Sequence, residues 1–596
     1  MRPAFRFARR LAFGQALFEA GGWFWIGDDR TGSGWGDLFA ATASLAVYGA
    51  LFSLLAFAFQ ARAVRWAGVG FVGSMPAQYL WIHGTSGLGA LDYVFMVLLG
   101  AAAVFAVLKP SEAWDRALLG ILPAAWVLAP LTAALWLVPA TEIWRGEVPS
   151  VPPPVAAPNL VLISWDTVRA DALDLYGGRG APTPHLDRLA AEGIVFEDAV
   201  SHAPITGPSH ATILTGLTPP EHGLRSNGSD VLAGSVRTLP EILGEAGYRT
   251  GGFAAAFPMA GRFGFHRGFE IYHDRIEHAG FARLSQLGQR NFWWLFALDP
   301  LLPHDPHVSV PGAEVNRRVA EWLERLTGAD EPRPFFLFVH YYDAHGPYAP
   351  AEPWRAQALA VADPRPVAAD PGSERAMNLY RGEISQLDAQ WADLRAALEK
   401  LDPGLRNTLI AVTADHGECF GEGGIIQNHT PSVLEATQRV PLILREPDGV
   451  AGTARREART VTHVDLLPTF LQAAGLPAPE GLPGRSLLTG SGAVLAAEHP
   501  VYIEAAQSHL GEDRRIAWRA SGWKYVQWHG GRRELWNLRD GEPEEQDRAA
   551  ERADLCEELQ RRLEAFLATI KIVEGGSLEL TASDLAVMRA LGYVGD

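Results

Sequence analysis

Four long apolar runs occupy most of the first 145 residues, and they constrain the fold of this part of the chain more than any other feature. A helix needs about 20 apolar residues to cross a bilayer. The first and last runs meet this length, whereas the middle two would need their weakly polar flanks. The runs are Leu38–Phe59, Ala67–Ile82, Tyr93–Leu108 and Ala117–Ala140. A weaker run over Leu11–Ile26 contains Glu19 and either spans the bilayer or lies in the interface.

Basic residues alternate with acidic ones between these runs, and this alternation sets an expected orientation. Two of the connections, Gly27–Asp37 and His83–Asp92, together carry one arginine and several aspartates, whereas the N-terminus and the other two connections are basic. The basic residues are Arg6, Arg9, Arg10, Arg62, Arg65, Lys109 and Arg116. The pattern predicts an all-helical transmembrane domain over residues 1–145, with about five spans and the N-terminus in the cytoplasm. A set of buried core helices in a soluble domain is the alternative.

The rest of the chain reads as a soluble protein that follows a Pro-rich linker, residues 146–158. With this orientation it lies outside a bacterial-type cytoplasmic membrane, so the bilayer is an expected partner. The formal net charge of −17 argues against nucleic acid as a partner. Cys419 and Cys556 are the only cysteines and lie far apart in the sequence, so we expect no disulfide framework.

Three short apolar runs in the soluble part end in residues that can do chemistry. Such runs, separated by helical patterns, are typical of buried strands in a largely parallel sheet. Ligands bind beyond the carboxyl ends of such strands, so the three ends are expected to meet at one site. The runs are Asn159–Trp165 before Asp166, Pro334–Val339 before His340 and His345, and Thr408–Ala414 before Asp415 and His416.

A fourth segment, Ala203–Gly216, begins with features of a helix N-terminus. Thr206 is where an N-cap residue would lie, and Pro208 suits the first helical turn. Thr206 could simply cap this helix. In the functional interpretation, the free N–H groups of the helix favour an anion beside the Thr206 hydroxyl.

Taken in order, these segments resemble the sulfatase family of the alkaline phosphatase superfamily, from about Asn159 to the C-terminus. The resemblance implies an α/β fold with a mixed, mostly parallel sheet between helices over residues 159–495. A small antiparallel sheet over residues 496–596 is expected to follow, with a hairpin over Trp523–Leu538. The motifs are Asp166–Asp171, Pro208–Gly216, His222–Gly223, Asp343–Tyr348, Thr413–Glu418, Arg439–Ile443, Val464–Thr469, Glu534–Leu538 and Leu591–Val594.

The sequence departs from the sulfatase pattern at the nucleophile and at one of the metal-binding aspartates. Sulfatases carry Cys-x-Pro-Ser-Arg, whose cysteine becomes formylglycine, whereas this chain has Thr206-Gly-Pro-Ser-His210. The paired aspartates of many sulfatases are reduced to Asp166 followed by Thr167. This pattern is similar to that of lipoteichoic acid synthases and phosphoethanolamine transferases, which are also polytopic membrane proteins.

We assign Asp166, Thr206, Asp415 and His416 to one divalent metal ion. Mixed oxygen and nitrogen ligands suit zinc or manganese best, with calcium and magnesium as alternatives. The metal would lower the pKa of the Thr206 hydroxyl and make it the catalytic nucleophile.

His345 and His429 are predicted to hold phosphoryl oxygens or to protonate the leaving group. Alternatively, the two histidines help to hold a second metal ion. His210, Arg169 and Arg225 are candidate substrate contacts, although both arginines could instead form structural ion pairs.

The expected function is phosphoester hydrolysis or phosphoryl transfer through a covalent phospho-threonine. Sulfate ester hydrolysis is one alternative, and a catalytically inactive, membrane-anchored binding protein is another. The substrate is expected to be a phosphoester or sulfate ester, and a lipid or a glycan could carry it.

Overall fold

The computed structural model describes residues 143–274 and 309–580, apart from short stretches within each range. The predicted transmembrane domain therefore lies outside the described residues, except for its last three. Among the described residues, no helix is long and apolar enough to cross a membrane. Residues Ile143–Arg145 had been assigned to the helical domain, but they form strand β1, which pairs with β6. The sheet thus begins before the Pro-rich linker and not after it.

A nine-stranded mixed sheet forms the centre of the described part, in the order β1-β6-β5-β7-β2-β8-β11-β3-β12. The five strands from β6 to β8 run parallel to one another. β11 is antiparallel to both of its neighbours. The strands are β1 (Ile143–Arg145), β2 (Asn159–Trp165), β3 (Ile194–Val200), β5 (Arg249–Phe253), β6 (Ile271–His273), β7 (Phe335–Tyr341), β8 (Thr408–Thr413), β11 (Arg439–Arg445) and β12 (Arg455–Thr462).

The three strands predicted from apolar runs lie side by side in the middle of this sheet. β2 pairs in parallel with β7 on one side and with β8 on the other. Their apolar side chains are almost fully buried because helices cover both faces of the sheet. Ser164 is in register with both His340 and Thr413, so the carboxyl ends of the strands coincide. The predicted convergence of these strand ends is confirmed.

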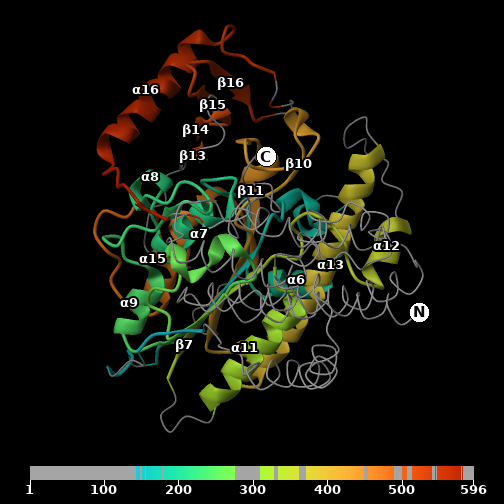
Figure 1. Cartoon of the computed structure of the whole chain (residues 1–596), viewed down its shortest axis with the longest axis vertical. Coiled ribbons are helices and arrows are strands. Elements are labelled where there is room, and N and C mark those ends of the chain that lie inside the picture. Colours follow the sequence, from blue (N-terminus) through green and yellow to red (C-terminus); the bar gives the residue numbers. More distant parts are fainter. Residues whose placement is uncertain are drawn as a thin grey trace, which may run out of the picture. The chain divides into compact units, whose positions relative to one another are not determined.

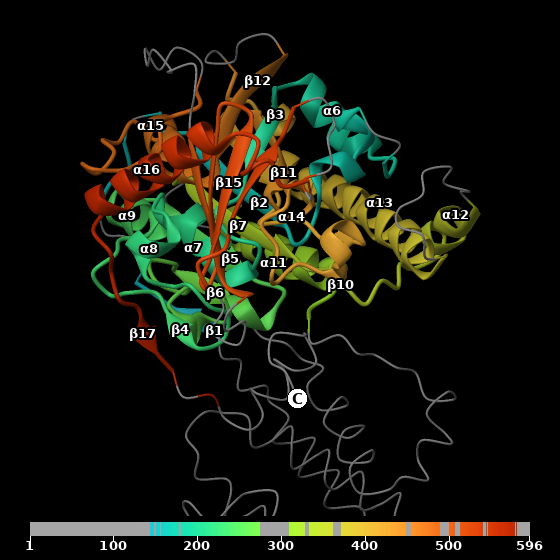
Figure 2. The ribbon, with the colours of Figure 1, turned by 90° about the horizontal axis from the view of Figure 1, so that it is seen from above.

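Two groups of helices flank the sheet (Figures 1 and 2). α6 (Pro184–Ala191), α11 (Gly312–Thr327) and α13 (Pro371–Glu399) form one group. α7 (Thr206–Thr215), α9 (Leu239–Glu245) and α15 (Leu466–Ala473) form the other. In α11, Val315, Val319 and Trp322 recur at helical spacing and are buried. The Trp322 ring lies so close to Gly251 that a Cβ there would be 2.8 Å from it.

The C-terminal part forms the predicted small antiparallel sheet, which has four strands, and one helix covers it. The strands are β13 (Val501–Ala505), β14 (Arg515–Ala520), β15 (Trp523–Trp528) and β16 (Arg533–Asn537), and the helix is α16 (Ala553–Thr569). β15 and β16 form the expected hairpin. Its turn contains Gly531 at φ +88°, a conformation that favours glycine. Both cysteines are free thiols.

Candidate active site

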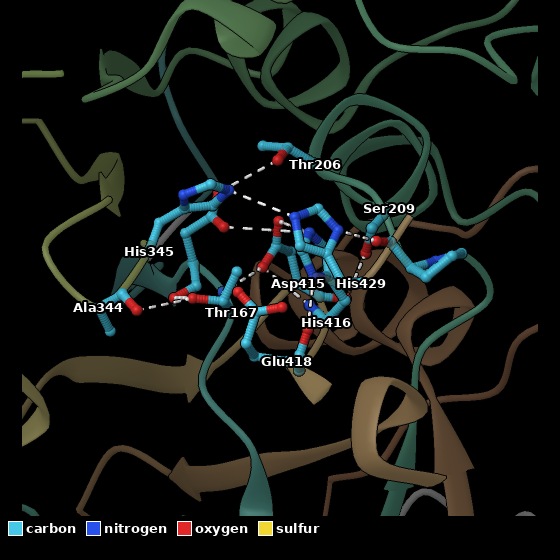
Figure 3. A network of polar contacts seen from close by, with 12 residues as sticks. Thr167, Thr206, Ser209, Ala344, His345, Asp415, His416, Glu418 and His429 are labelled. Carbon is cyan, nitrogen blue, oxygen red and sulfur yellow. Dashed lines mark hydrogen bonds and ion pairs between the residues drawn. The ribbon is translucent and has the colours of Figure 1, made fainter. Parts of the chain in front are cut away.

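Three ligand atoms from two strand ends meet in a buried cluster. Figure 3 labels two of the three residues, Asp415 and His416. Asp166 follows β2, and Asp415 and His416 follow β8. Ligand atoms of these three residues all lie within 4.8 Å of one another. His416 Nε2 is 3.3 Å from Asp415 Oδ2 and 3.9 Å from Asp166 Oδ1. All three side chains are fully buried.

The same three atoms have no hydrogen-bond partner among the described residues, which fits a metal ion. They are Asp166 Oδ1, Asp415 Oδ2 and His416 Nε2. The second oxygen of each carboxylate is occupied instead. Asp415 Oδ1 accepts from the backbone N–H groups of Thr167 and His416, at 3.1 and 2.8 Å. Buried polar atoms without partners are rare, and a bound cation would satisfy all three at once.

Electrostatics also favours a cation at this cluster. Burial raises the pKa of Asp166 to about 8, although hydrogen bonds from its neighbours oppose the shift. Burial and the nearby Asp166 carboxylate raise the pKa of Asp415 well above its ordinary value. Burial lowers the pKa of His416 well below its ordinary value, which keeps the imidazole neutral, as a metal ligand must be. A divalent ion would compensate the two carboxylate charges.

His340, the last residue but one of β7, orients the Asp166 carboxylate. The backbone N–H of Ala255 donates to His340 Nδ1 at 3.3 Å. We therefore assign the ring proton to Nε2, which donates to Asp166 Oδ2 at 3.0 Å. This hydrogen bond turns Oδ1 of Asp166 toward the other two ligand atoms.

Thr167 holds the turn after β2 in an unusual backbone conformation. Its φ is +60°, which a β-branched residue rarely adopts. Its hydroxyl donates to the carbonyl oxygens of Asp166 and Ala344, at 2.7 and 3.0 Å. Its own carbonyl accepts from the hydroxyl of Tyr380 at 2.8 Å. The hydroxyl thus ties the Asp166 strand end to the segment that carries His345, and it points away from the metal ligands.

The Thr206 hydroxyl donates to Asp166 Oδ2 at 3.3 Å and so lies beside the predicted metal ligands. Helix α7 begins at Thr206 itself, which makes Ile205 the N-cap residue. The predicted N-cap position of Thr206 is therefore off by one residue, and no side-chain cap bond is formed there. Thr206 lies in the first turn of the helix, whose N–H groups favour negative charge.

Asn227 is a site residue that the sequence analysis did not identify. Its Oδ1 accepts from the backbone N–H of Gly207 at 2.7 Å, next to the Thr206 hydroxyl. Its Nδ2 is buried and has no partner among the described residues. A buried amide N–H₂ group beside a helix N-terminus is suited to donate to a substrate oxygen. Asn227 lies in a polar loop without periodicity, so no sequence pattern marks it.

The structure brings His345 and His429 together, next to the metal ligands (Figure 3). Their Nε2 atoms are 3.3 Å apart. The His429 ring lies 4.3 Å from that of His416, centroid to centroid. Nδ1 of His345 faces the Gly346 carbonyl at 2.8 Å, and Nδ1 of His429 faces that of Pro204 at 2.6 Å. Because a carbonyl only accepts, both Nδ1 atoms carry protons, and the two Nε2 atoms face one another beside the metal-ligand cluster.

The two arginines that were candidate substrate contacts form ion pairs instead. Arg169 donates to Asp171 at 2.7 and 2.8 Å and to Glu422 at 2.7 Å. Arg225 makes a bidentate pair with Glu504, at 2.7 and 2.8 Å. This geometry corrects the substrate-binding assignment and agrees with the structural alternative.

His210 lies within helix α7, and its side chain is fully buried. Its Nδ1 is 2.8 Å from the Thr206 carbonyl oxygen, and its Nε2 is 2.9 Å from Ser164 Oγ. With both nitrogens engaged and no exposed surface, the residue supports the helix and the β2 end. The predicted substrate contact at His210 is corrected accordingly.

The family description "Sulfatase" matches residues 158–476 of the 596, which is more than half of the chain. Among curated relatives, an uncharacterized sulfatase of Escherichia coli is 27% identical over 372 residues, covering 56% of this chain and 70% of the relative. An arylsulfatase of Clostridium perfringens is 26% identical over 375 residues, covering 55% of this chain and 77% of the relative. A multifunctional alkaline phosphatase superfamily protein of Trinickia caryophylli is 27% identical over 418 residues, covering 55% and 76%.

Solved structures support the same fold. The phosphonate monoester hydrolase of Agrobacterium radiobacter aligns at a TM-score of 0.54 and 20% identity, covering 71% of this chain and 100% of that one. A protein solved with its substrate D-glucosamine-2-N,6-O-disulfate aligns at 0.57 and 20% identity, covering 69% and 98%. By the extent of the family match and the fold, this chain belongs to the sulfatase family and is a hydrolase of the alkaline phosphatase superfamily.

Proposed function

We propose that this protein hydrolyses phosphoesters or transfers their phosphoryl group, with Thr206 as the nucleophile. The observation that carries the proposal is the hydrogen bond from the Thr206 hydroxyl to Asp166, whose other oxygen belongs to the metal-ligand cluster. Asp166, Asp415 and His416 would hold the metal, with Thr206 completing the set. When bound, the metal supplies positive charge that lowers the pKa of the nucleophile and stabilises the transition state.

In the first step, Thr206 Oγ1 attacks the phosphorus. The P–Oγ1 bond forms while the bond to the leaving oxygen breaks, and the hydroxyl proton passes along the existing hydrogen bond to Asp166. The Asn227 amide and the N–H groups of the first turn of α7 donate to the non-bridging oxygens. In the second step, water or an acceptor alcohol attacks the phosphorus and gives its proton to the His345–His429 pair. The P–Oγ1 bond breaks, and the proton held by Asp166 returns to Thr206 Oγ1.

The His345–His429 pair supplies the proton for the leaving oxygen. Burial lowers the pKa of His345 to about 4 and that of His429 to about 3, so the rings are neutral without substrate. An anionic oxygen beside both Nε2 atoms favours the protonated form and raises the pKa of the pair. The substrate thus brings the charge that lets the pair act as a general acid.

Sulfate ester hydrolysis is the second candidate function, and the comparisons favour it over the phosphoester interpretation. The family match and most of the relatives described carry the name sulfatase. The residue at position 206 opposes it. A formylglycine hydrate has a second hydroxyl that expels sulfate by elimination, whereas a sulfo-threonine lacks this group. A phospho-threonine can be resolved by direct attack of water.

Parallel assays separate the two candidates. The full-length chain would be tested with bis(4-nitrophenyl) phosphate, 4-nitrophenyl phosphate and 4-nitrophenyl sulfate under multiple-turnover conditions. We expect a higher kcat/KM for at least one phosphoester than for the sulfate ester. Efficient multiple-turnover cleavage of the sulfate ester, with slower phosphoester cleavage, would establish the second candidate instead. Metal binding without turnover of any of the three would favour the binding-protein alternative.

A further inference from the structure

The end of the described chain returns to the catalytic domain and lies against both segments that flank Thr206. We name residues 573–578 together with Leu580 the C-terminal strap. We propose that this strap is a positioning element for the nucleophile, holding the Asn227 loop and the approach to helix α7 in place. The inference rests on the proposed role of Thr206.

Backbone hydrogen bonds fix the strap along the loop of residues 220–231. The N–H of Val573 donates to the Pro220 carbonyl at 2.8 Å, and that of Leu578 donates to the Ser229 carbonyl at 2.9 Å. Between them, β17 (Gly576–Ser577) pairs antiparallel with β4 (Asp230–Val231). The loop is thus bonded to the strap near both of its ends.

A contact between two glycines brings the strap close to this loop. A Cβ on Gly575 would lie 2.4 Å from the Gly223 carbonyl oxygen and 2.9 Å from that of Val231. A Cβ on Gly223 would lie 2.7 Å from the Gly575 nitrogen. These obstacles are backbone atoms, which cannot move aside as a flexible side chain can, so alanine at position 575 would push the strap away from the loop.

The loop carries Asn227, whose side chain accepts from the backbone N–H of Gly207. At the far end of the strap, Leu580 packs against the buried residues Ala203 and Ile205. Ile205 is the N-cap residue of α7 and directly precedes Thr206. The strap therefore supports the nucleophile from two sides, through the loop that bonds Gly207 and through the segment that precedes Thr206.

The strap contacts described above are to the segments that flank Thr206 and not to the three metal-ligand residues at the strand ends. Asp166, Asp415 and His416 follow β2 and β8 and are held by Thr167, His340 and the backbone of the strand ends. Losing the strap should therefore misplace Thr206 and Asn227 while Asp166, Asp415 and His416 stay in place. This separation lets a positioning role be distinguished from general destabilisation.

The test compares Gly575→Ala and Leu580→Ala with Leu580→Met and Ile572→Ala in the full-length chain. Leu580→Met keeps most of the apolar contact, and Ile572 is 60% exposed on the same segment, so both serve as controls. We expect kcat on bis(4-nitrophenyl) phosphate to fall about 10- to 100-fold in the first two variants, because small misplacements of reacting groups have effects of this size. Bound metal should change less than twofold, because Asp166, Asp415 and His416 stay in place, and both controls should keep the wild-type kcat.

Hydrogen exchange on the same variants provides a readout that does not need activity. We expect faster exchange of the Gly207 amide and of residues 223–231 in Gly575→Ala and Leu580→Ala, and wild-type exchange at β2 and β8. Unchanged exchange at Gly207, or unchanged kcat in both variants with an active wild type, would overturn the proposal. Should the wild type cleave none of the three nitrophenyl esters, the proposed function fails, and exchange alone decides whether the strap holds the loop.

Discussion

At the scale of single residues, the decisive fact is that three ligand atoms are buried together with no hydrogen-bond partner in the part of the chain that the structure describes. Asp166, Asp415 and His416 each present one such atom to the same point. Their other polar atoms bond to the protein, so the side chains are held in place before any ion binds. The three residues could therefore hold a metal ion without rearranging.

Asp166→Ala and Asp415→Ala are expected to abolish metal binding and turnover together. Elemental analysis of the purified chains measures the first effect, with Asp187→Ala, an exposed carboxylate on α6, as the control. Metal added at about 100 times its Kd should stabilise the wild type by about 2.7 kcal/mol and leave both variants unchanged. Full metal occupancy in either variant would refute the ligand assignment.

The effect of His429→Gln on kcat should depend on the leaving group if His429 protonates the leaving oxygen. A general acid matters most when the leaving alcohol is a weak acid, so methyl 4-nitrophenyl phosphate and dimethyl phosphate make a matched pair. We expect a loss of about 10²- to 10⁴-fold in kcat for dimethyl phosphate. The loss in kcat for methyl 4-nitrophenyl phosphate should be much smaller, because 4-nitrophenolate leaves without needing a proton. Equal losses on both would show that His429 binds the substrate without protonating the leaving oxygen.

The sequence predicted the residues that follow strands and missed those that lie elsewhere. Asp166, Asp415 and His416 come directly after buried apolar runs, and parallel strand ends meet in space. His340 lies inside such a run, where a buried histidine gives no separate signal. The Arg225–Glu504 pair joins residues 279 apart in the sequence, and composition or spacing carries no information on such a pairing.

At the scale of elements, helix α7 is held by neutral histidines that contribute to stability. Thr212 Oγ1 is 3.1 Å from His222 Nε2, and Ser209 Oγ is 3.3 Å from His463 Nδ1. Burial lowers the pKa of both histidines to about 3. Because their pKa is near 6.5 in the unfolded chain, the stability they contribute is complete above pH 6.5 and is lost as the pH falls toward 3.

We therefore expect the free energy of unfolding to fall by about 2 kcal/mol per histidine when the pH is lowered from 7.5 to 5. The value follows because pH 5 lies 1.5 units below the unfolded-state pKa of 6.5, and 1.5 units correspond to about 2 kcal/mol. His222→Gln should be less stable than the wild type at pH 7.5 but should lose about 2 kcal/mol less on acidification. Urea unfolding in EDTA, followed by tryptophan fluorescence, measures both values. An identical pH dependence in the variant would contradict the assignment.

Some boundaries of helices and strands could be predicted from the sequence, and others could not. The strands β2, β7 and β8 and the β15–β16 hairpin could be predicted because long apolar runs and a Gly-Gly turn mark them. β1 has three residues and follows an apolar block, so the sequence gives no reason to separate it. Thr167 adopts a positive φ that its side chain disfavours, and only the hydrogen bonds of the folded site explain this conformation.

At the scale of the whole molecule, the strap and β1 show that chain order is a poor guide to spatial order. β17 follows the C-terminal sheet in sequence but pairs with β4 of the catalytic domain. Such distant pairings depend on the folded shape and could not be read from local patterns. The antiparallel sheet begins with β13 at Val501, whereas the strap that follows this sheet in sequence pairs with β4 of the catalytic part.

Membrane orientation is a prediction from the basic connections of residues 1–145. We expect a reporter fused within the Pro-rich linker, residues 146–158, to report an extracytoplasmic position. A reporter fused between Arg62 and Arg65 should report a cytoplasmic one. Alkaline phosphatase and green fluorescent protein fusions at both points give complementary readouts. The reverse pattern would put the catalytic domain in the cytosol and contradict the charge-based orientation.

The role of Thr206 is tested most directly by the mass of the peptide that contains it. The full-length chain would be quenched in acid during turnover of bis(4-nitrophenyl) phosphate or 4-nitrophenyl sulfate, then digested and analysed by mass spectrometry. We predict a 4-nitrophenylphosphoryl adduct on Thr206 from the phosphodiester, or a sulfo adduct from the sulfate ester, in the wild type. We predict no adduct and no turnover in Thr206→Ala, and measurable turnover in Thr206→Ser. Wild-type turnover by Thr206→Ala, without an adduct on the wild-type peptide, would contradict the account.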